Sequence, residues 1–140
     1  MGKINWGRVF VCGLVTGVVT FVLGGLIIAV WGKDFEAGVT ALGRPFALPK
    51  SPGLFFIILV LNLVMGIVII WLYAAIRPRY GPGPKTAAVV GFAMWLIMTM
   101  SDVFIMSLGL LPVRMLVGPI AASLAAFIAA AEAGAWLYKE

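Results

Sequence analysis

The sequence predicts an all-α integral membrane protein with four transmembrane helices arranged as two antiparallel hairpins. Three observations support this fold class. Hydrophobic residues make up 64% of the 140 residues and charged residues only 11%, whereas about 25% of the residues in a soluble domain are charged. The mean hydropathy is +1.16. The apolar residues also gather in four long runs, each long enough to cross a hydrocarbon layer about 30 Å thick.

These runs define the spans of one transmembrane domain, residues 1–140. The predicted spans cover about residues 9–32, 53–76, 86–108 and 113–138. The first run carries no charge and exceeds the roughly 7–15 apolar residues of a signal peptide, so we predict a retained helix. Ser51 and Pro52 suit the cap and first position of the second helix. Gly109 and Pro112 suit a tight turn between the third and fourth helices.

The longest connection, from Lys33 to Lys50, contains apolar residues at helical spacing. They are Phe35, Val39, Leu42 and Phe46. Such a stripe predicts a short helix lying in the membrane interface, which Gly43 would end. An ordered loop is the alternative interpretation of this connection.

A basic stretch with three prolines, from Arg77 to Lys85, separates the second and third spans. Proline and the residue before it disfavour helical geometry, so we expect no helix to pass through this stretch. Because Lys and Arg favour cytoplasmic loops, we place the stretch and both termini in the cytoplasm. We expect Arg77, Arg79 and Lys85 to contact anionic lipid headgroups.

Two of the predicted helices carry a face of small residues. The residues at spacings of four, three and four are Gly13, Gly17, Thr20 and Gly24 in the first helix, and Gly118, Ala122, Ala125 and Ala129 in the fourth. Membrane helices associate through close backbone approach, so we expect the two faces to mesh antiparallel. Gly13 would then lie opposite Ala129, and Gly24 opposite Gly118. The alternative is that small residues are simply common in membrane helices.

Four charged or amide side chains fall within the predicted spans: Asn62, Asp102, Arg114 and Glu132. We expect Asn62 to form an interhelical hydrogen bond. Asp102 lies just before the turn that leads to Arg114, which favours a structural ion pair between them. The other interpretation is a protonatable carboxylate in an ion or proton path. Glu132 has the same two interpretations in the opposite leaflet.

The composition argues against catalysis. The chain has no histidine and a single cysteine, Cys12, which excludes imidazole chemistry, an intrachain disulfide and a multi-cysteine metal site. Asp102 and Glu132 are predicted too far apart for a catalytic carboxylate pair. We therefore predict no enzyme activity, no metal, no cofactor and no nucleic-acid partner. The sequence leaves a bound lipid, quinone or pigment open.

Three short motifs carry a resemblance to known sequences: Asn5-Trp6, Leu42-Gly43 and Gly134-Ala-Trp136. With the four-span layout, they resemble a family of uncharacterised small bacterial four-helix membrane proteins of unknown function. If the protein is bacterial, its location is the inner or plasma membrane. The resemblance implies no activity.

Two function classes follow from the sequence. The first is a non-catalytic accessory or structural subunit of a larger membrane complex, or a small homo-oligomer, so that its partners are other membrane subunits or itself. The alternative is a small ion, proton or solute transporter or channel that uses Asp102 and Glu132.

Overall fold

The computed structural model describes residues 4–41, 43, 51–109 and 113–138, with the exception of the Arg114 side chain. This part of the chain forms four helices: α1 (Trp6–Ala41), α2 (Pro52–Tyr80), α3 (Pro84–Ser107) and α4 (Val113–Leu137). All four are long and apolar enough to cross a membrane. The predicted fold, an all-α integral membrane protein with four spans, is confirmed.

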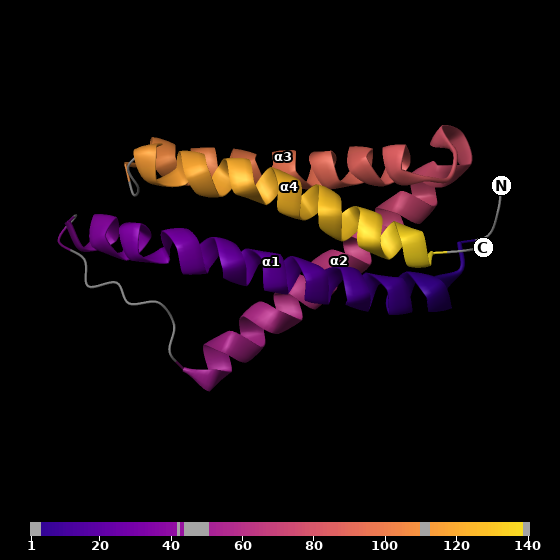
Figure 1. Ribbon diagram of the computed structural model, residues 1–140, viewed down its shortest axis with the longest axis horizontal. Coiled ribbons are helices and arrows are strands. Elements are labelled where there is room, and N and C mark those ends of the chain that lie inside the picture. Colours follow the sequence, from indigo (N-terminus) through magenta and orange to yellow (C-terminus); the bar gives the residue numbers. More distant parts are fainter. Residues whose placement is uncertain (1–3, 42, 44–50, 110–112, 139–140) are drawn as a thin grey trace.

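Consecutive helices run antiparallel and pack pairwise. α1 packs against both α2 and α4, and α3 packs mainly against α4. In Figure 1, α1, α3 and α4 run roughly alongside one another, while α2 crosses them obliquely. The turn between α2 and α3 lies at the same end of the bundle as both termini (Figure 1). We call this end the terminal end.

The buried core lies towards the terminal end and contains residues of all four helices. Its buried members are Val9, Cys12, Ile69, Ile70, Tyr73, Ala74, Ala87, Val90, Met94, Ala131, Ala135 and Tyr138. The Thr16 hydroxyl is also buried, and it donates a hydrogen bond to the Cys12 carbonyl oxygen at 3.0 Å. By contrast, residues 52–58, at the start of α2, are all exposed. α2 is therefore embedded in the bundle mainly over its second half.

The predicted interfacial helix is wrong as a separate element, because α1 continues without a break from the membrane span to Ala41. No proline lies between Gly32 and Ala41, and buried Gly38 packs against the Met115 side chain of α4. At 36 residues, α1 is about 54 Å long and exceeds the thickness of the hydrocarbon layer. Gly43 ends the helix as predicted, with φ 75°. The rest of that prediction, from residue 44 on, lies outside the described residues.

The prediction that no helix passes through the basic stretch is confirmed, because residues 81–83 separate α2 from α3. The expected start of this break at Arg77 and Pro78 is wrong, since α2 continues through both residues to Tyr80. A proline this close to the end of a helix removes only one backbone hydrogen bond. The Gly81 N–H then donates to the Arg77 carbonyl oxygen at 2.8 Å and closes the last turn. The link to α3 is thus shorter than predicted, since α3 already begins at Pro84.

The caps of α2 and α3 agree with the sequence prediction where the structure describes them. The Ser51 hydroxyl oxygen accepts a hydrogen bond from the Leu54 N–H at 3.2 Å, and Pro52 begins α2. After α3, Gly109 has φ 71° and its N–H donates to the Met106 carbonyl oxygen. Pro112 lies outside the described residues.

The small-residue faces pack differently from the prediction. Gly13 and Gly17 lie against α2, where a Cβ added to Gly66 would meet the backbone of both. Gly24 has open space around its Cα, and Ala125 and Ala129 are exposed. The predicted register of Gly13, Gly17, Thr20 and Gly24 against Gly118, Ala122, Ala125 and Ala129 is therefore wrong.

α1 and α4 do pack antiparallel, but in another register. The indole of Trp31 lies against Gly118, and the Thr16 side chain lies against Gly134. Relative to the predicted pairing of Gly24 with Gly118, α4 is displaced by roughly two helical turns. The physical reason is that α2 already packs against Gly13 and Gly17, so α4 packs against a neighbouring face of α1.

Candidate functional site

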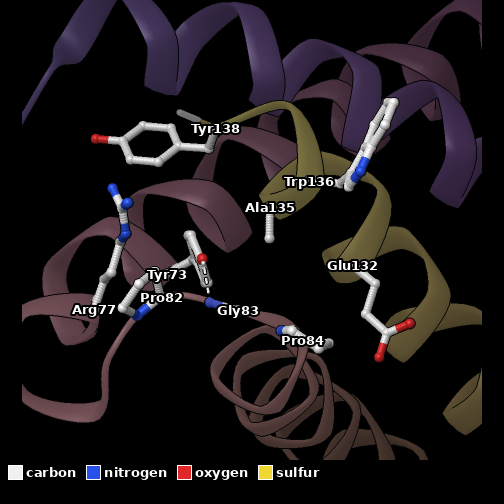
Figure 2. Close-up of a pocket in the computed structure, with 9 residues that line it drawn as sticks. All are labelled: Tyr73, Arg77, Pro82, Gly83, Pro84, Glu132, Ala135, Trp136 and Tyr138. Atoms are coloured by element: carbon white, nitrogen blue, oxygen red, sulfur yellow. Dashed lines mark hydrogen bonds between the residues drawn. The ribbon is translucent and has the colours of Figure 1, made fainter. Parts of the chain in front are cut away.

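Three side chains form a stack at the terminal end of the bundle. The rings of Tyr73 and Tyr138 meet edge to face, with centroids 6.0 Å apart and an interplanar angle of 85°. The guanidinium carbon of Arg77 lies 5.7 Å from the centroid of the Tyr138 ring. A cation over an aromatic face is attracted by the quadrupole of the ring. The stack therefore joins α2 to the end of α4 and positions a cation there (Figure 2).

Side-chain hydrogen bonds hold the turn between α2 and α3 against this stack. The Tyr73 hydroxyl oxygen accepts a hydrogen bond from the Gly83 N–H at 3.1 Å. The Thr86 hydroxyl donates to the Gly81 carbonyl oxygen at 2.7 Å. Gly83 has φ 132°, a backbone conformation that glycine adopts without strain. The short turn is thus positioned by the two helices that flank it.

A cavity of about 730 Å³ opens beside the stack, and we call it the terminal cavity. It is lined by Tyr73, Arg77, Pro82, Gly83, Pro84, Glu132, Ala135, Trp136 and Tyr138. Figure 2 shows Arg77 and Glu132 on opposite sides of this group of residues, with Tyr73, Gly83 and Pro84 between them. The lining of the cavity therefore includes a cation, a carboxylate and three aromatic side chains, and the charged groups of Arg77 and Glu132 point in different directions (Figure 2).

From the sequence, Arg77 is expected to contact lipid headgroups and Glu132 is an intramembrane acid, but no sequence pattern places the two in one cavity. The available signal was that both lie towards the same end of the predicted bundle. Tyr73 and Tyr138 were missed because a tyrosine near the end of a span is most simply an interfacial anchor. Arg79 and Lys85 are exposed at this end, and their contact with anionic headgroups stays a prediction.

Asp102 lies in a separate cavity nearer the other end of the bundle. This space of about 320 Å³ is lined by Ile27, Ile28, Trp31, Gly32, Phe35, Asp102, Leu116 and Pro119. Asp102 is half-buried, and it has no hydrogen bond or ion pair with any residue whose side chain the structure describes. Its predicted pairing with Arg114 lies outside the described residues. Asp102 and Glu132 thus line different cavities.

Asn62 does not form the predicted interhelical hydrogen bond, because its side-chain N–H donates to the Ile58 carbonyl oxygen of the same helix at 2.8 Å. An interhelical hydrogen bond is formed instead by the Trp95 indole. Its N–H donates to the Ile120 carbonyl oxygen of α4 at 2.9 Å. A partly buried indole N–H usually finds such an acceptor, and this pair fixes α3 against α4.

The motifs that carry the family resemblance have local structural roles. The Asn5 side-chain oxygen accepts a hydrogen bond from the Arg8 N–H at 3.2 Å, at the start of α1. Gly134 gives room to the Thr16 side chain. Comparison with known proteins adds no family, since no protein-family model, curated protein or solved structure matches this chain.

Proposed function

We propose that the protein is a non-catalytic membrane subunit that binds other membrane helices, either as an accessory or structural component of a larger complex or as a small homo-oligomer. The observation that carries this proposal is the exposure of the first half of α2. Five consecutive residues from Leu54 to Ile58 are exposed, and the Phe56 side chain exposes 64% of its surface. Because successive residues point about 100° apart around a helix, five in a row cover every side.

Among the residues that the structure describes, this half of α2 makes one aromatic contact with its own bundle. The Phe55 ring meets the Phe21 ring of α1 edge to face, with centroids 5.2 Å apart. Lipid can cover the other sides, but helices in a membrane gain van der Waals packing from one another. A helix that leaves its own bundle gives up that packing, and a helix from a partner would restore it. This supports association through residues 52–61.

The experiment compares two phenylalanines with equal exposure. Phe56 in α2 and Phe104 in α3 each expose 64% of their surface. We expect Phe56→Ala to lower severalfold the fraction of the extracted protein that is in a complex. The reason is that an aromatic side chain at the centre of an interface contributes more than about 1 kcal/mol to the free energy of binding. Phe104→Ala should leave that fraction unchanged. The measurement is native mass spectrometry of protein extracted directly into lipid nanodiscs.

The masses distinguish the two forms of the proposal. Multiples of the chain mass indicate a homo-oligomer, and a larger unrelated mass indicates a subunit of another complex. A monomer in nanodiscs from native membranes would contradict both. Equal losses for Phe56→Ala and Phe104→Ala would show that the first half of α2 is a lipid-facing surface.

The alternative function, a small ion, proton or solute transporter or channel, draws support from one observation. Asp102 is a half-buried carboxylate beside a cavity between apolar side chains of α1 and α4, and an intramembrane acid often marks an ion path. However, Glu132 lines a different cavity, so the two acids do not face one common space. This separation is why we favour the subunit.

A further inference from the structure

We propose that the partner of the exposed half of α2 is a second copy of this chain, docked so that the Asn62 side chains of the two copies form hydrogen bonds with each other across a two-fold axis. This inference rests on the proposed function, association through the first half of α2, and it names the partner. Two observations carry it: an open groove between α1 and α2, and the hydrogen-bonding groups of Asn62 that remain available in that groove.

The groove opens where α1 and α2 diverge beyond their crossing at Gly66 (Figure 1). It has a volume of about 260 Å³ and is lined by α1 residues that include Gly24 and Gly25 and by α2 residues that include Ile58 and Asn62. We call it the α1–α2 groove. A Cβ added at Gly24 or Gly25 would have no atom within 4 Å. A further helix can therefore approach the α1 backbone closely here, as small residues permit in membranes.

Asn62 lies deep in the membrane. α2 runs from Pro52 to Tyr80, so its middle is at residue 66, and Asn62 is about 6 Å from that point along the helix axis. The hydrocarbon layer extends about 15 Å to either side of its centre. Lipid headgroups do not reach this depth, and acyl chains have no group that can form a hydrogen bond.

The amide of Asn62 has hydrogen-bonding groups to spare. One N–H donates to the Ile58 carbonyl oxygen of its own helix at 2.8 Å. An asparagine side chain has a second N–H and a carbonyl oxygen that accepts. Neither of these forms a hydrogen bond with any residue that the structure describes. A partner that satisfies both must therefore bring a donor and an acceptor to the same point in the hydrocarbon.

A second copy of the chain brings exactly such a pair, because an amide is complementary to itself. Across a two-fold axis, the N–H of one Asn62 donates to the side-chain oxygen of the other, and the reverse bond forms at the same time. In such an interface the same residues serve on both sides. A single asparagine is known to set the register and the number of helices that associate. α2 of each copy then lies in the α1–α2 groove of the other, against Gly24 and Gly25.

The test uses the purified chain alone in phosphatidylcholine vesicles. Native mass spectrometry over a range of lipid-to-protein ratios measures the fraction of dimer, and we expect a wild-type dimer of twice the chain mass. Asn62→Leu removes both hydrogen bonds and should lower about tenfold the lipid-to-protein ratio at which half of the dimer dissociates. Gly25→Leu should also weaken the dimer, because its side chain fills the groove. It should keep the fold, since position 25 has open space.

The matched control is Val64→Leu, which introduces the same side chain in the same helix. Val64 is exposed and does not line the α1–α2 groove, and it points about 200° away from Asn62 around the helix. This variant should dimerise like the wild type. A dimer that Asn62→Leu leaves unchanged, or that Val64→Leu weakens equally, would overturn the proposal.

Failure of this inference is distinguishable from failure of the proposed function. If the purified wild type is monomeric in vesicles at every ratio but leaves native membranes in a complex of larger, unrelated mass, the second copy is ruled out and the subunit function stands. If the chain is monomeric in nanodiscs made from native membranes as well, both fail.

Discussion

The crossing of α1 and α2 depends on close contact between glycines, and Gly66→Ala tests it. A Cβ at position 66 would meet the Gly13 carbonyl oxygen and lie 2.6 Å from the Gly17 Cα. These are backbone atoms that cannot rotate away, so the helices must separate. Overpacking of this kind costs about 1–3 kcal/mol, and the higher helix propensity of alanine offsets about 1 kcal/mol. Because the clash is with backbone, we expect the upper part of that range and a net loss of about 1–2 kcal/mol.

The assay is equilibrium unfolding by SDS titration in mixed micelles, followed by the fluorescence of the five tryptophans. Gly24→Ala is the matched control, because a Cβ at position 24 has no atom within 4 Å. This control should leave the free energy of unfolding unchanged or raise it by up to about 1 kcal/mol. If Gly24→Ala destabilises the protein while Gly66→Ala does not, α1 packs through the face predicted from the sequence and the described crossing is refuted.

Three other changes test further features. Trp95→Phe removes the hydrogen bond to the Ile120 carbonyl oxygen and should lower the free energy of unfolding by about 1 kcal/mol in the same titration; no change would show that this bond does not hold α3 to α4. A cysteine at Gly81 in a Cys12→Ala background should resist an impermeant thiol reagent added to intact cells, and labelling from outside would reverse the predicted orientation. Asp102→Asn should leave any ion flux in reconstituted vesicles unchanged, and a wild-type flux that vanishes in this variant would favour the transporter.

The fold could be predicted from the sequence because apolar length alone defines a membrane span. Gly43, Ser51 and Gly109 mark helix ends through local backbone geometry, and these ends were predicted correctly. The limits of α1 and α2 were not, because they depend on tertiary contacts. Gly38 packs against Met115 of α4 and supports the last turns of α1. The passage of α2 through Pro78 accompanies the contact of Arg77 with Tyr138.

A pattern of small residues predicts where helix backbones come close, but it does not predict the partner helix or the register. Gly13 and Gly17 correctly indicated close backbone approach, but a glycine does not specify which helix approaches it. The partner is α2, whose Gly66 offers an equally small surface. For α1 and α4 the register follows from a large side chain that enters a small-residue position, Trp31 at Gly118. A stripe of small residues has no such feature, so several registers fit it equally well.

The terminal cavity could not be predicted for a related reason. Arg77 and Glu132 belong to helices that are not adjacent in sequence, and both line the terminal cavity. No sequence pattern within either helix predicts that the two residues line the same cavity. The residue types were visible in the sequence, whereas their common cavity depends on how α2 and α4 converge.

The two ends of the bundle should respond differently to a ligand, because the core lies at one of them. Residues of α2, of the α2–α3 turn and of α4 line the terminal cavity, so a ligand bound there would hold these three segments together. A ligand that binds only the folded state at one hundred times its Kd adds about 2.7 kcal/mol to the free energy of unfolding. The first half of α2 contributes nothing to this cavity, so its exposure to a partner should not change. Ligand binding at the terminal cavity and complex formation should therefore be separable, and Phe56→Ala should affect only the second.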